Sequence, residues 1–215
     1  MKQSEIEVIL LDVMGNDNSI ADAARVSFHK TSDNFTEEQN NKLIVYLAKH
    51  NHWSPFSHCY AKFRIKAPIF IARQLAKHVV GLAWNEVSRR YVDEEPEFWF
   101  PKEWRERADN VKQGSGGIVE DSVMFRSISV ELTKECLATY SNMLACNVAP
   151  EMARMVLPQN TMTEWIWSGS LAAFARVCKL RLDPHAQLET QQVAALIRDQ
   201  IEPLFPVSFK ALMEN

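Results

Sequence analysis

The alternation of apolar and polar residues predicts several strands. Residues 59–67 alternate strictly: Cys59, Ala61, Phe63, Ile65 and Ala67 are separated by tyrosine, lysine or arginine, which is typical of a half-buried strand. The run IEVILLDV at 6–13 predicts a first, buried strand, and TMTEWIWS at 161–168 alternates briefly.

Helical spacing of apolar residues predicts the other elements. A helix is expected over 36–50, opened by a capping box of Thr36 and Gln39. A long helix is also expected over 121–147, a shorter one from Pro150 onward, and another over 170–180. A last long helix over 185–204 would begin with Asp183 as its cap and Pro184 in its first turn.

A further helix is expected to start at Pro68 and run to His78. In that helix Gln74, Lys77 and His78 fall at spacings of three and four residues and would share one face. Gly81 and the loop after it would end the helix.

The remaining segments predict turns and loops. Residues 89–101 look extended and interrupted by prolines, and VKQGSGGIVED at 111–121 is the one Gly/Ser-rich stretch, so a mobile surface loop is expected at about 110–120. With no repeat and no clear linker, the order of strands and helices favours one α+β domain over 1–215. A two-domain arrangement is the less favoured alternative.

Composition narrows the classes of protein. Hydrophobic residues make up 47% of the chain, but no apolar run is long enough to cross a bilayer. The first residues lack a basic segment followed by a long apolar one, so no secretory signal is indicated and a cytoplasmic protein is expected, bacterial or phage-encoded. The four cysteines lack metal-ligand spacing and are expected to be buried thiols, without a metal site.

The charge pattern points to a small anion. The formal net charge of -3 gives no general attraction to nucleic acid polymers. No GxGxxG, GxxxxGK[ST], GxSxG or HExxH motif occurs. Cationic and amide side chains nevertheless concentrate beside apolar sequence, at Arg73, Gln74, Lys77, Arg89, Arg90, Arg154 and Arg181.

Two interpretations of these cations stay open. Each arginine could pair with a local acid, such as Arg90 with Asp93 or Arg181 with Asp183. Alternatively, because only Glu86 offsets the cations of 73–91, the surplus could bind a phosphate, which suits the planar guanidinium.

Several segments together resemble the flavin-dependent thymidylate synthases. RQLAKHVVGLAWNEVSRRY at 73–91 is similar to a family signature in which Arg-Gln precedes a basic-His-basic triplet and then Asn-Glu-x-Ser-x-Arg-Tyr. HNHWSPFSH at 50–58, ARMVLPQNTMTEW at 153–165, LRLDPHAQLETQQ at 180–192 and AARVSF at 23–28 resemble other family segments in the family's order. The resemblance covers nearly the whole chain.

The resemblance implies a fold and a reaction. The fold would be a single α+β domain with helices around a central, mainly antiparallel sheet and no Rossmann motif. The reaction would be reductive methylation of dUMP to dTMP, with 5,10-methylenetetrahydrofolate as carbon donor, FAD as cofactor and NADPH as reductant. It would use no cysteine nucleophile, in a homotetramer whose active sites are shared between subunits.

The resemblance also implies roles for residues. Arg181 would be catalytic, because it would lie against the pyrimidine and stabilise the ionised N3. Residues implied to bind the nucleotide are Gln74, Lys77, Glu86, Ser88, Arg89, Arg90, Arg154 and Arg181. Residues implied to lie near the flavin are His52, Ser54, Lys77, His78, Glu86, Arg176 and His185.

Some of these residues have a second interpretation. Glu86 could instead be a helix-cap carboxylate. Trp53 and Trp84 adjoin motifs, so each is either a core residue or a stacking partner for a cofactor ring.

The chain departs from the family pattern in two places. The usual Arg-His-Arg triplet is Lys77-His78-Val79 here, and one extra residue follows it before Ser88. Ser170, Ala172 and Arg176 stand where many relatives carry Asn, Arg and Asn, which suggests that Arg176 supplies a charge lost at Val79 or Ala172. Two alternatives therefore remain: the same fold acting as a variant hydroxymethylase or methylase of a pyrimidine nucleotide, dUMP or dCMP, and a non-catalytic nucleotide-binding homologue.

Overall fold

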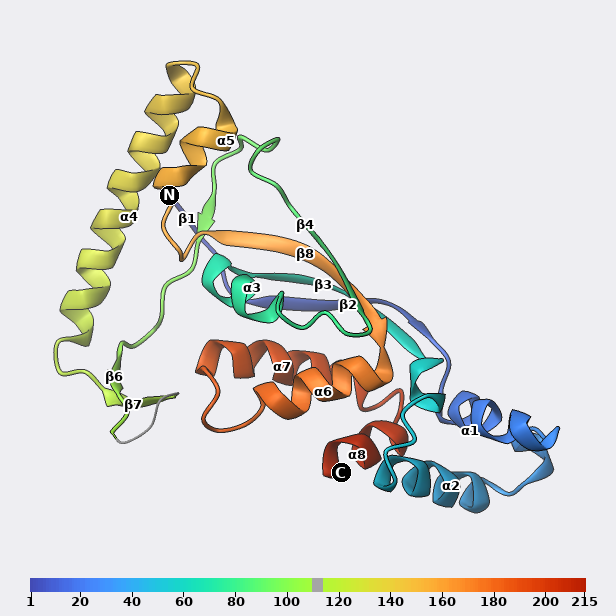
Figure 1. Ribbon diagram of the computed structural model, residues 1–215. Helices are drawn as coiled ribbons and strands as arrows, with labels where there is room; N and C mark the ends of the chain where they lie inside the picture. The colour runs from blue at the N-terminus through green and yellow to red at the C-terminus, as the bar shows by residue number, and fades with distance from the viewer. Residues whose placement is uncertain (110–113) are drawn as a thin grey trace.

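A four-stranded antiparallel sheet is the centre of the fold. The computed structural model describes residues 1–109 and 114–215. The sheet has the order β2 (Glu7–Met14), β3 (Tyr60–Pro68), β8 (Met162–Ser170) and β4 (Leu82–Glu86). Helices α6 (Leu171–Arg181) and α7 (Leu188–Ile201) cover one face of it (Figure 1). The expected single α+β domain with an antiparallel sheet is confirmed.

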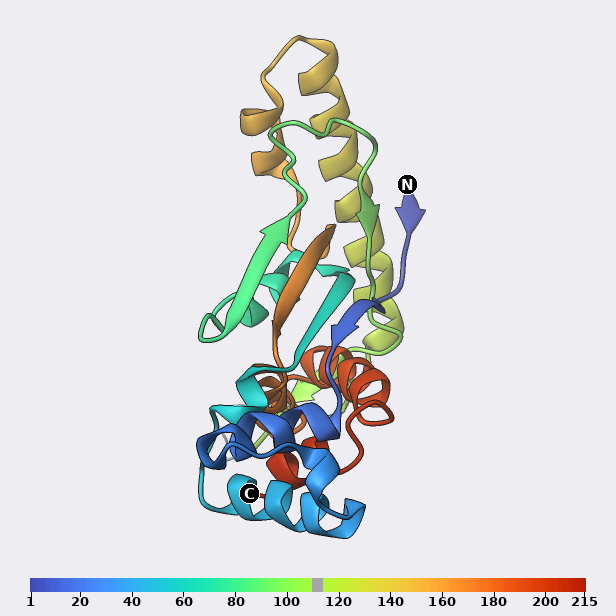
Figure 2. The same ribbon diagram turned by 90° about the vertical axis from the view of Figure 1, so that its right-hand side faces the viewer.

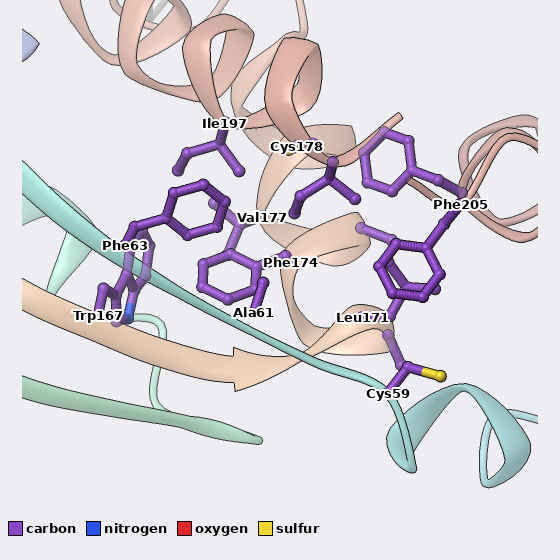
Figure 3. Close-up of a cluster of buried hydrophobic side chains, with 14 of the residues drawn as sticks. Cys59, Ala61, Phe63, Trp167, Leu171, Phe174, Val177, Cys178, Ile197 and Phe205 are labelled. Atoms are coloured by element: carbon purple, nitrogen blue, oxygen red, sulfur yellow. The ribbon is translucent and has the colours of Figure 1, made fainter. Parts of the chain in front are cut away.

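The main core lies between this sheet and α6 (Figure 3). Phe63 of β3 lies opposite Trp167 of β8, and both rings pack edge-on against Phe174 of α6, at centroid distances of 5.1 and 5.5 Å. Ala61 and Val177 are buried beside them. The alternation seen in the sequence at 59–67 therefore does place its apolar residues in the core.

The prediction of a buried first strand is wrong in part. β2 forms as expected, but it is an edge strand paired only with β3 on the described chain. Because the helices cover the opposite face of the sheet, Ile9 and Leu11 remain 48% and 43% exposed.

One end of the molecule is formed by α1 (Asp17–Arg25), α2 (Glu37–Lys49) and α8 (Ser208–Glu214) (Figure 1). The capping box of α2 is confirmed, since Thr36 Oγ1 accepts from the Gln39 N–H at 3.3 Å. Helix α1 was not predicted, although Asn16 and Ser19 form a capping box at its start. The short 3-10 turns η1 (Val26–Phe28) and η2 (Ser32–Asn34) connect α1 to α2, and η3 (Pro55–Ser57) connects α2 to β3.

The opposite end carries the long helix α4 (Ser122–Ala145), followed by α5 (Pro150–Ala153) and the turn η4 (Arg154–Val156) (Figures 1 and 2). Two small sheets lie near it: β1 (Lys2–Gln3) with β5 (Glu97–Phe98), and β6 (Arg105–Arg107) with β7 (Ser115–Ile118). The mobile loop expected at about 110–120 is wrong for 115–118, which pair with β6, and residues 110–113 lie outside the described residues.

Helix α3 (Ile69–Leu75) is shorter than expected. The chain leaves the helix at Ala76 and reaches Gly81, whose φ of +74° reverses it into β4. The β-branched Val79 and Val80, which disfavour helix, lie in this turn. The prediction that Gln74, Lys77 and His78 share a helix face is therefore wrong.

The last long helix also begins later than expected. Asp183 Oδ1 accepts from the His185 N–H at 2.7 Å, and the Ala186 N–H donates to the Asp183 carbonyl at 2.8 Å. Asp183 and Pro184 thus form a local turn, and α7 starts at Leu188. None of the helices in the described part of the chain is both long and apolar enough to cross a membrane.

Candidate active site

The predicted site residues separate into two groups at opposite ends of β4. His78 and the turn after α3 lie before this strand, whereas Glu86 ends it and Ser88 and Arg90 follow. The five steps from Gly81 to Glu86 span about 16 Å at the usual rise of a strand. Within one chain the signature segment 73–91 therefore does not converge on a single point.

The first group, called the His78 cluster, consists of Gln74, His78, Arg176 and Arg181. Arg181 Nε donates to His78 Nε2 at 2.9 Å, and Arg176 Nη2 donates to the Val80 carbonyl at 2.7 Å. Gln74 Oε1 accepts from the Thr190 hydroxyl of α7. Side-chain hydrogen bonds thus join α6 to the turn after α3, and α7 to α3 itself.

The electrostatics of this cluster keep His78 uncharged. Burial, and then the nearby Arg181 and Arg176, lower the pKa of His78 below its ordinary value of 6.5. Burial also lowers the pKa of Arg181, but a guanidinium stays protonated in proteins. At neutral pH the pair is therefore a neutral imidazole and a half-buried cation.

Pairing of the arginines with local acids is wrong for the two examples considered. Arg181 bonds His78, while Asp183 contacts His185 Nδ1 at 3.0 Å. Hydrogen bonds from the His185 backbone and ring lower the pKa of Asp183. Arg90 donates from Nε to Ser88 Oγ at 3.1 Å, and its guanidinium lies 4.8 Å from the Tyr91 ring centre.

The second group of residues lines a cavity of about 360 Å³ beyond the end of β4, called the Glu86 cavity. Its lining includes Glu86, Arg89, Arg154, Lys66 and Thr163. Glu86 accepts from Trp84 Nε1 at 3.1 Å and from Thr163 Oγ1 at 2.8 Å. Because Glu86 ends a strand, its helix-cap interpretation is wrong.

Cations and carboxylates both line the Glu86 cavity. Arg89 donates one bond to the Glu94 carbonyl and Arg154 one to the Glu151 carbonyl, at 2.7 and 3.2 Å. Each guanidinium carries five N–H groups, so both retain donors for a ligand. Lys66 forms a 2.5 Å ion pair with Glu97, and this hydrogen bond lowers the pKa of Glu97.

A smaller cavity of about 160 Å³ lies between α2 and α6. His52, Trp53, Arg176 and Lys179 line it. Trp53 is 64% exposed, whereas Trp84 stacks on Trp165 of the core at 4.4 Å. Of the two tryptophans, only Trp53 presents a ring to this cavity.

The other flavin-side predictions lie at the surface or in the core. Ser54, Lys77 and His185 are exposed. Ser170 caps α6 by accepting from the Ala173 N–H at 3.3 Å, and Ala172 is buried.

Sequence reasoning missed Lys66, Thr163 and Thr190, which contact or line these clusters. Lys66 and Thr163 belong to strands that run into the Glu86 cavity, so strand alternation was the signal that could have found them. Among the described residues no three His, Cys, Asp or Glu side chains converge as metal ligands would.

Comparisons with known proteins identify the family. The family model described as "Thymidylate synthase complementing protein" matches residues 9–207. A flavin-dependent thymidylate synthase of Thermus thermophilus is 38% identical over 208 residues, which are 97% of this chain and 76% of that protein.

The chain belongs to the flavin-dependent thymidylate synthase family.

Other relatives agree with this assignment. The flavin-dependent thymidylate synthase of Kosmotoga olearia is 37% identical, over 95% of this chain and 88% of that one. Among solved structures, the UMP/dUMP methylase PolB of Streptomyces cacaoi, bound with 5-Br dUMP, matches with a TM-score of 0.90 and 28% identity, over 100% of this chain and 97% of that chain. The family is thus supported by sequence along nearly the full length and by fold.

Proposed function

We propose that this protein methylates dUMP to dTMP reductively, taking the carbon from 5,10-methylenetetrahydrofolate and using FAD and NADPH. The observation that carries the proposal is the Arg181–His78 pair: in a member of this family, a half-buried guanidinium is held by a neutral acceptor and keeps donors free. Such a cation can stabilise negative charge that develops on a pyrimidine ring.

The two buried cysteines support a route without a thiolate nucleophile. The expectation of four buried thiols is wrong for the other two, because Cys146 is exposed and Cys136 is partly exposed. Cys178 lies one turn before Arg181, but burial raises its pKa to about 12. Burial likewise raises the pKa of Cys59 to about 11. Because the thiolate is the reactive form, neither side chain is suited to attack a pyrimidine at neutral pH.

The nucleotide phosphate is assigned to the arginines of the Glu86 cavity and its rim. Arg89 and Arg154 line the cavity, and Arg90 and Ser88 lie beside it in sequence. Arg89 and Arg154 keep N–H donors suited to a phosphate. Glu86 can accept from a sugar hydroxyl, while Gln74 and Lys77 would contact the nucleotide from the other end of β4.

The small cavity between α2 and α6 fits part of a flavin cofactor. It combines two cations, Arg176 and Lys179, with the aromatic His52 and Trp53, which suits an anionic, planar group. His78, Ser54 and His185 would approach the cofactor from neighbouring turns. When bound, reduced FAD would supply the hydride for the transferred carbon, and NADPH would reduce it again.

In the reaction, the protein's own groups bind and polarise the substrate. Arg181 would direct its remaining N–H groups to the pyrimidine and stabilise the ionised N3, which makes the ring carbon more nucleophilic. His78 would stay neutral as the acceptor for Arg181. The arginine phosphate contacts would fix the position of the ring relative to the carbon donor.

We further propose a cytoplasmic homotetramer, built from one domain over 1–215, whose active sites are shared between subunits. The separation of the two clusters along β4 supports sharing, because a second subunit could bring a Glu86 cavity to a His78 cluster. The exposed apolar side chains of α4 offer a surface for assembly.

The proposal predicts a yellow protein that oxidises NADPH faster when dUMP is present and makes dTMP. Replacing Arg181 by Met should lower kcat/KM for dUMP at least 100-fold, because a preorganised charged donor is lost. Product mass and NADPH absorbance measure both effects. Protein that takes up no added FAD, or an Arg181→Met variant of unchanged kcat/KM, would contradict the proposal.

A second candidate reaction is methylation of the ribonucleotide UMP. The similarity to a UMP/dUMP methylase with a TM-score of 0.90 favours it, and the unusual Lys77-His78-Val79 triplet leaves room for a change of substrate. Incubation with dUMP, UMP and dCMP, followed by product mass, distinguishes these reactions and separates methyl from hydroxymethyl products.

A further inference from the structure

The contact between His78 and Arg181 fixes which form of histidine is present. Arg181 Nε lies 2.9 Å from His78 Nε2, although the two residues are 103 positions apart. A guanidinium can only donate, so Nε2 must accept and carry no proton. The neutral ring then holds its proton on Nδ1.

We propose that His78 is a positioning residue that holds the Arg181 guanidinium in its reactive orientation, by accepting one hydrogen bond through its unprotonated Nε2. The significance for catalysis rests on the proposed function of Arg181. The contact itself is a property of this chain and can be tested without any substrate.

Arg181 needs such a partner because of its place in the fold. It is the last residue of α6, followed by the exposed turn at Asp183. A long side chain at a helix end has many rotamers, and fixing it costs conformational entropy at the moment of binding. A hydrogen bond at Nε fixes the plane of the fork and leaves the Nη donors for a ligand.

The turn that carries His78 is itself attached to α6. Arg176 Nη2 bonds the Val80 carbonyl at 2.7 Å. A Cβ added to Gly81 would lie 3.2 Å from Ala173 Cβ and 3.3 Å from Ser170 Oγ, so the turn packs closely on the start of the helix. His78 and Arg181 are therefore held by the same helix.

At Val79 and Val80, next to the unusual triplet, the turn is attached to α6 through a backbone carbonyl and not through a side chain. Arg176 contacts a carbonyl, and the side chains of Val79 and Val80 are 68% and 72% exposed. The lost arginine of the triplet and the extra residue can thus be accommodated without moving His78 from Arg181.

Protonation of His78 would remove the contact. The charged groups that act on it, Arg181 and Arg176, are both cations on α6, and β8 contributes the uncharged ring of Trp167 at 6.4 Å. An imidazolium at this site has no free lone pair and would face two like charges. The contact is therefore present above the lowered pKa of His78 and is lost as pH falls through it.

The direct test is ¹⁵N NMR of histidine-labelled protein, titrated with acid in the absence of substrate. His78, assigned by its loss in His78→Gln, should show protonated Nδ1 and unprotonated Nε2 at neutral pH, with a pKa below the ordinary 6.5. Arg181→Met should raise that pKa and mix the tautomers. Arg176→Met should raise the pKa but keep the tautomer, and Lys179→Met should change neither.

A protonated Nε2 in the wild-type protein, or a His78 titration that Arg181→Met leaves unchanged, would overturn the proposal. These readouts need no activity. If the tautomer is as expected but no nucleotide is methylated, the proposed function fails and the contact stands.

The role in positioning is tested by dUMP affinity and steady-state kinetics against pH. The wild-type protein should lose dUMP affinity as pH falls through the pKa of His78. His78→Gln, whose amide oxygen can accept from Arg181, should retain affinity within about 5-fold and lose this acid dependence. His78→Leu should weaken dUMP binding about 10-fold or more, which is the usual range for one lost charged hydrogen bond. Equal affinity and equal pH dependence in all three proteins would overturn the positioning role.

Discussion

At the scale of residues, Arg176 is placed by its neighbours so that it can bind an anionic ligand. It lies on α6, it lines the small cavity with His52 and Trp53, and it bonds the carbonyl of Val80. Among the described residues, Arg176 forms no ion pair with an Asp or Glu side chain. It is therefore available to an anionic ligand.

This assignment predicts that Arg176→Met binds FAD about 10-fold more weakly or worse, because a charge-assisted hydrogen bond contributes roughly 1.5–3 kcal/mol. Quenching of flavin fluorescence during titration measures the affinity. The matched control is Arg198→Met on α7, because this guanidinium bonds Asp199 and lines none of the cavities described above; FAD affinity should stay unchanged in this variant. Unchanged FAD affinity in Arg176→Met would show that Arg176 does not contact the flavin.

At the scale of residues, the sequence could identify candidates but not their partners. The surplus of cations over acids in 73–91 correctly suggested that the arginines are not all neutralised locally. The partner of Arg181 is nevertheless His78, 103 positions away, and the neighbouring Asp183 turned out to hold His185 instead. Only the packing of α6 against the turn after α3 decides between these partners.

At the scale of elements, strong hydrophobic periodicity correctly predicted which helices and strands exist. Local sequence signals such as capping residues and prolines did not predict correctly where the helices begin and end. The alternation of 59–67 gave β3, and the spacing of 121–147 gave α4. The Asp183-Pro184 pair reads as a helix start, but the aspartate is used by a tight turn. Helix α3 ends at Leu75 because the chain turns back to form β4, which pairs with β8. This pairing joins segments far apart in the sequence, so local sequence signals could not predict it.

A tie between elements can be tested at the Lys66–Glu97 ion pair, which connects β3 to β5. Lys66→Met should lower the free energy of unfolding by about 1 kcal/mol at pH 7, since the pair is partly exposed. The pKa of Glu97 is lowered in the folded state, so this contribution is present above its ordinary value of 4.5 and disappears as pH falls through the lowered value.

Urea unfolding of wild-type and variant protein at several pH values measures the difference. Lys42→Met is the matched control, because Lys42 pairs with Glu38 while both side chains are about three-quarters exposed. Its effect should stay within a few tenths of a kcal/mol. A Lys66→Met difference that does not shrink in acid would show that the lost stability comes from packing of the lysine stem.

At the scale of the whole molecule, the exposed apolar residues of α4 are not explained by packing within one chain. Only Ser122, Thr133 and Tyr140 of its 24 residues are buried. Phe125, Ile128 and Leu132 lie at spacings of three and four residues and are 42%, 47% and 56% exposed. The sequence pattern of an amphipathic helix was correct, but its apolar face points away from the core of this chain.

An exposed apolar stripe of this kind is expected to be covered in an assembly. The double substitution Ile128→Glu and Leu132→Glu should therefore reduce the mass measured by light scattering from that of a tetramer to a smaller species. Ser141→Glu adds a charge to the same helix on a different side, by helical spacing, and should leave the mass unchanged. Circular dichroism checks that each variant remains folded.

Assembly and activity should fail together if the active sites are shared. The two ends of β4, one beside the His78 cluster and one at the Glu86 cavity, are about 16 Å apart at the usual rise of a strand. We therefore expect a single subunit to hold a phosphate or a pyrimidine but not both parts of one nucleotide. Mixing an Arg181→Met protein with an Arg154→Met protein tests this directly. Each alone should be inactive, and reassociated mixtures should recover activity, because some sites combine an intact cluster with an intact cavity. Mixtures that form mixed tetramers without any recovery would place both clusters in sites built from one chain.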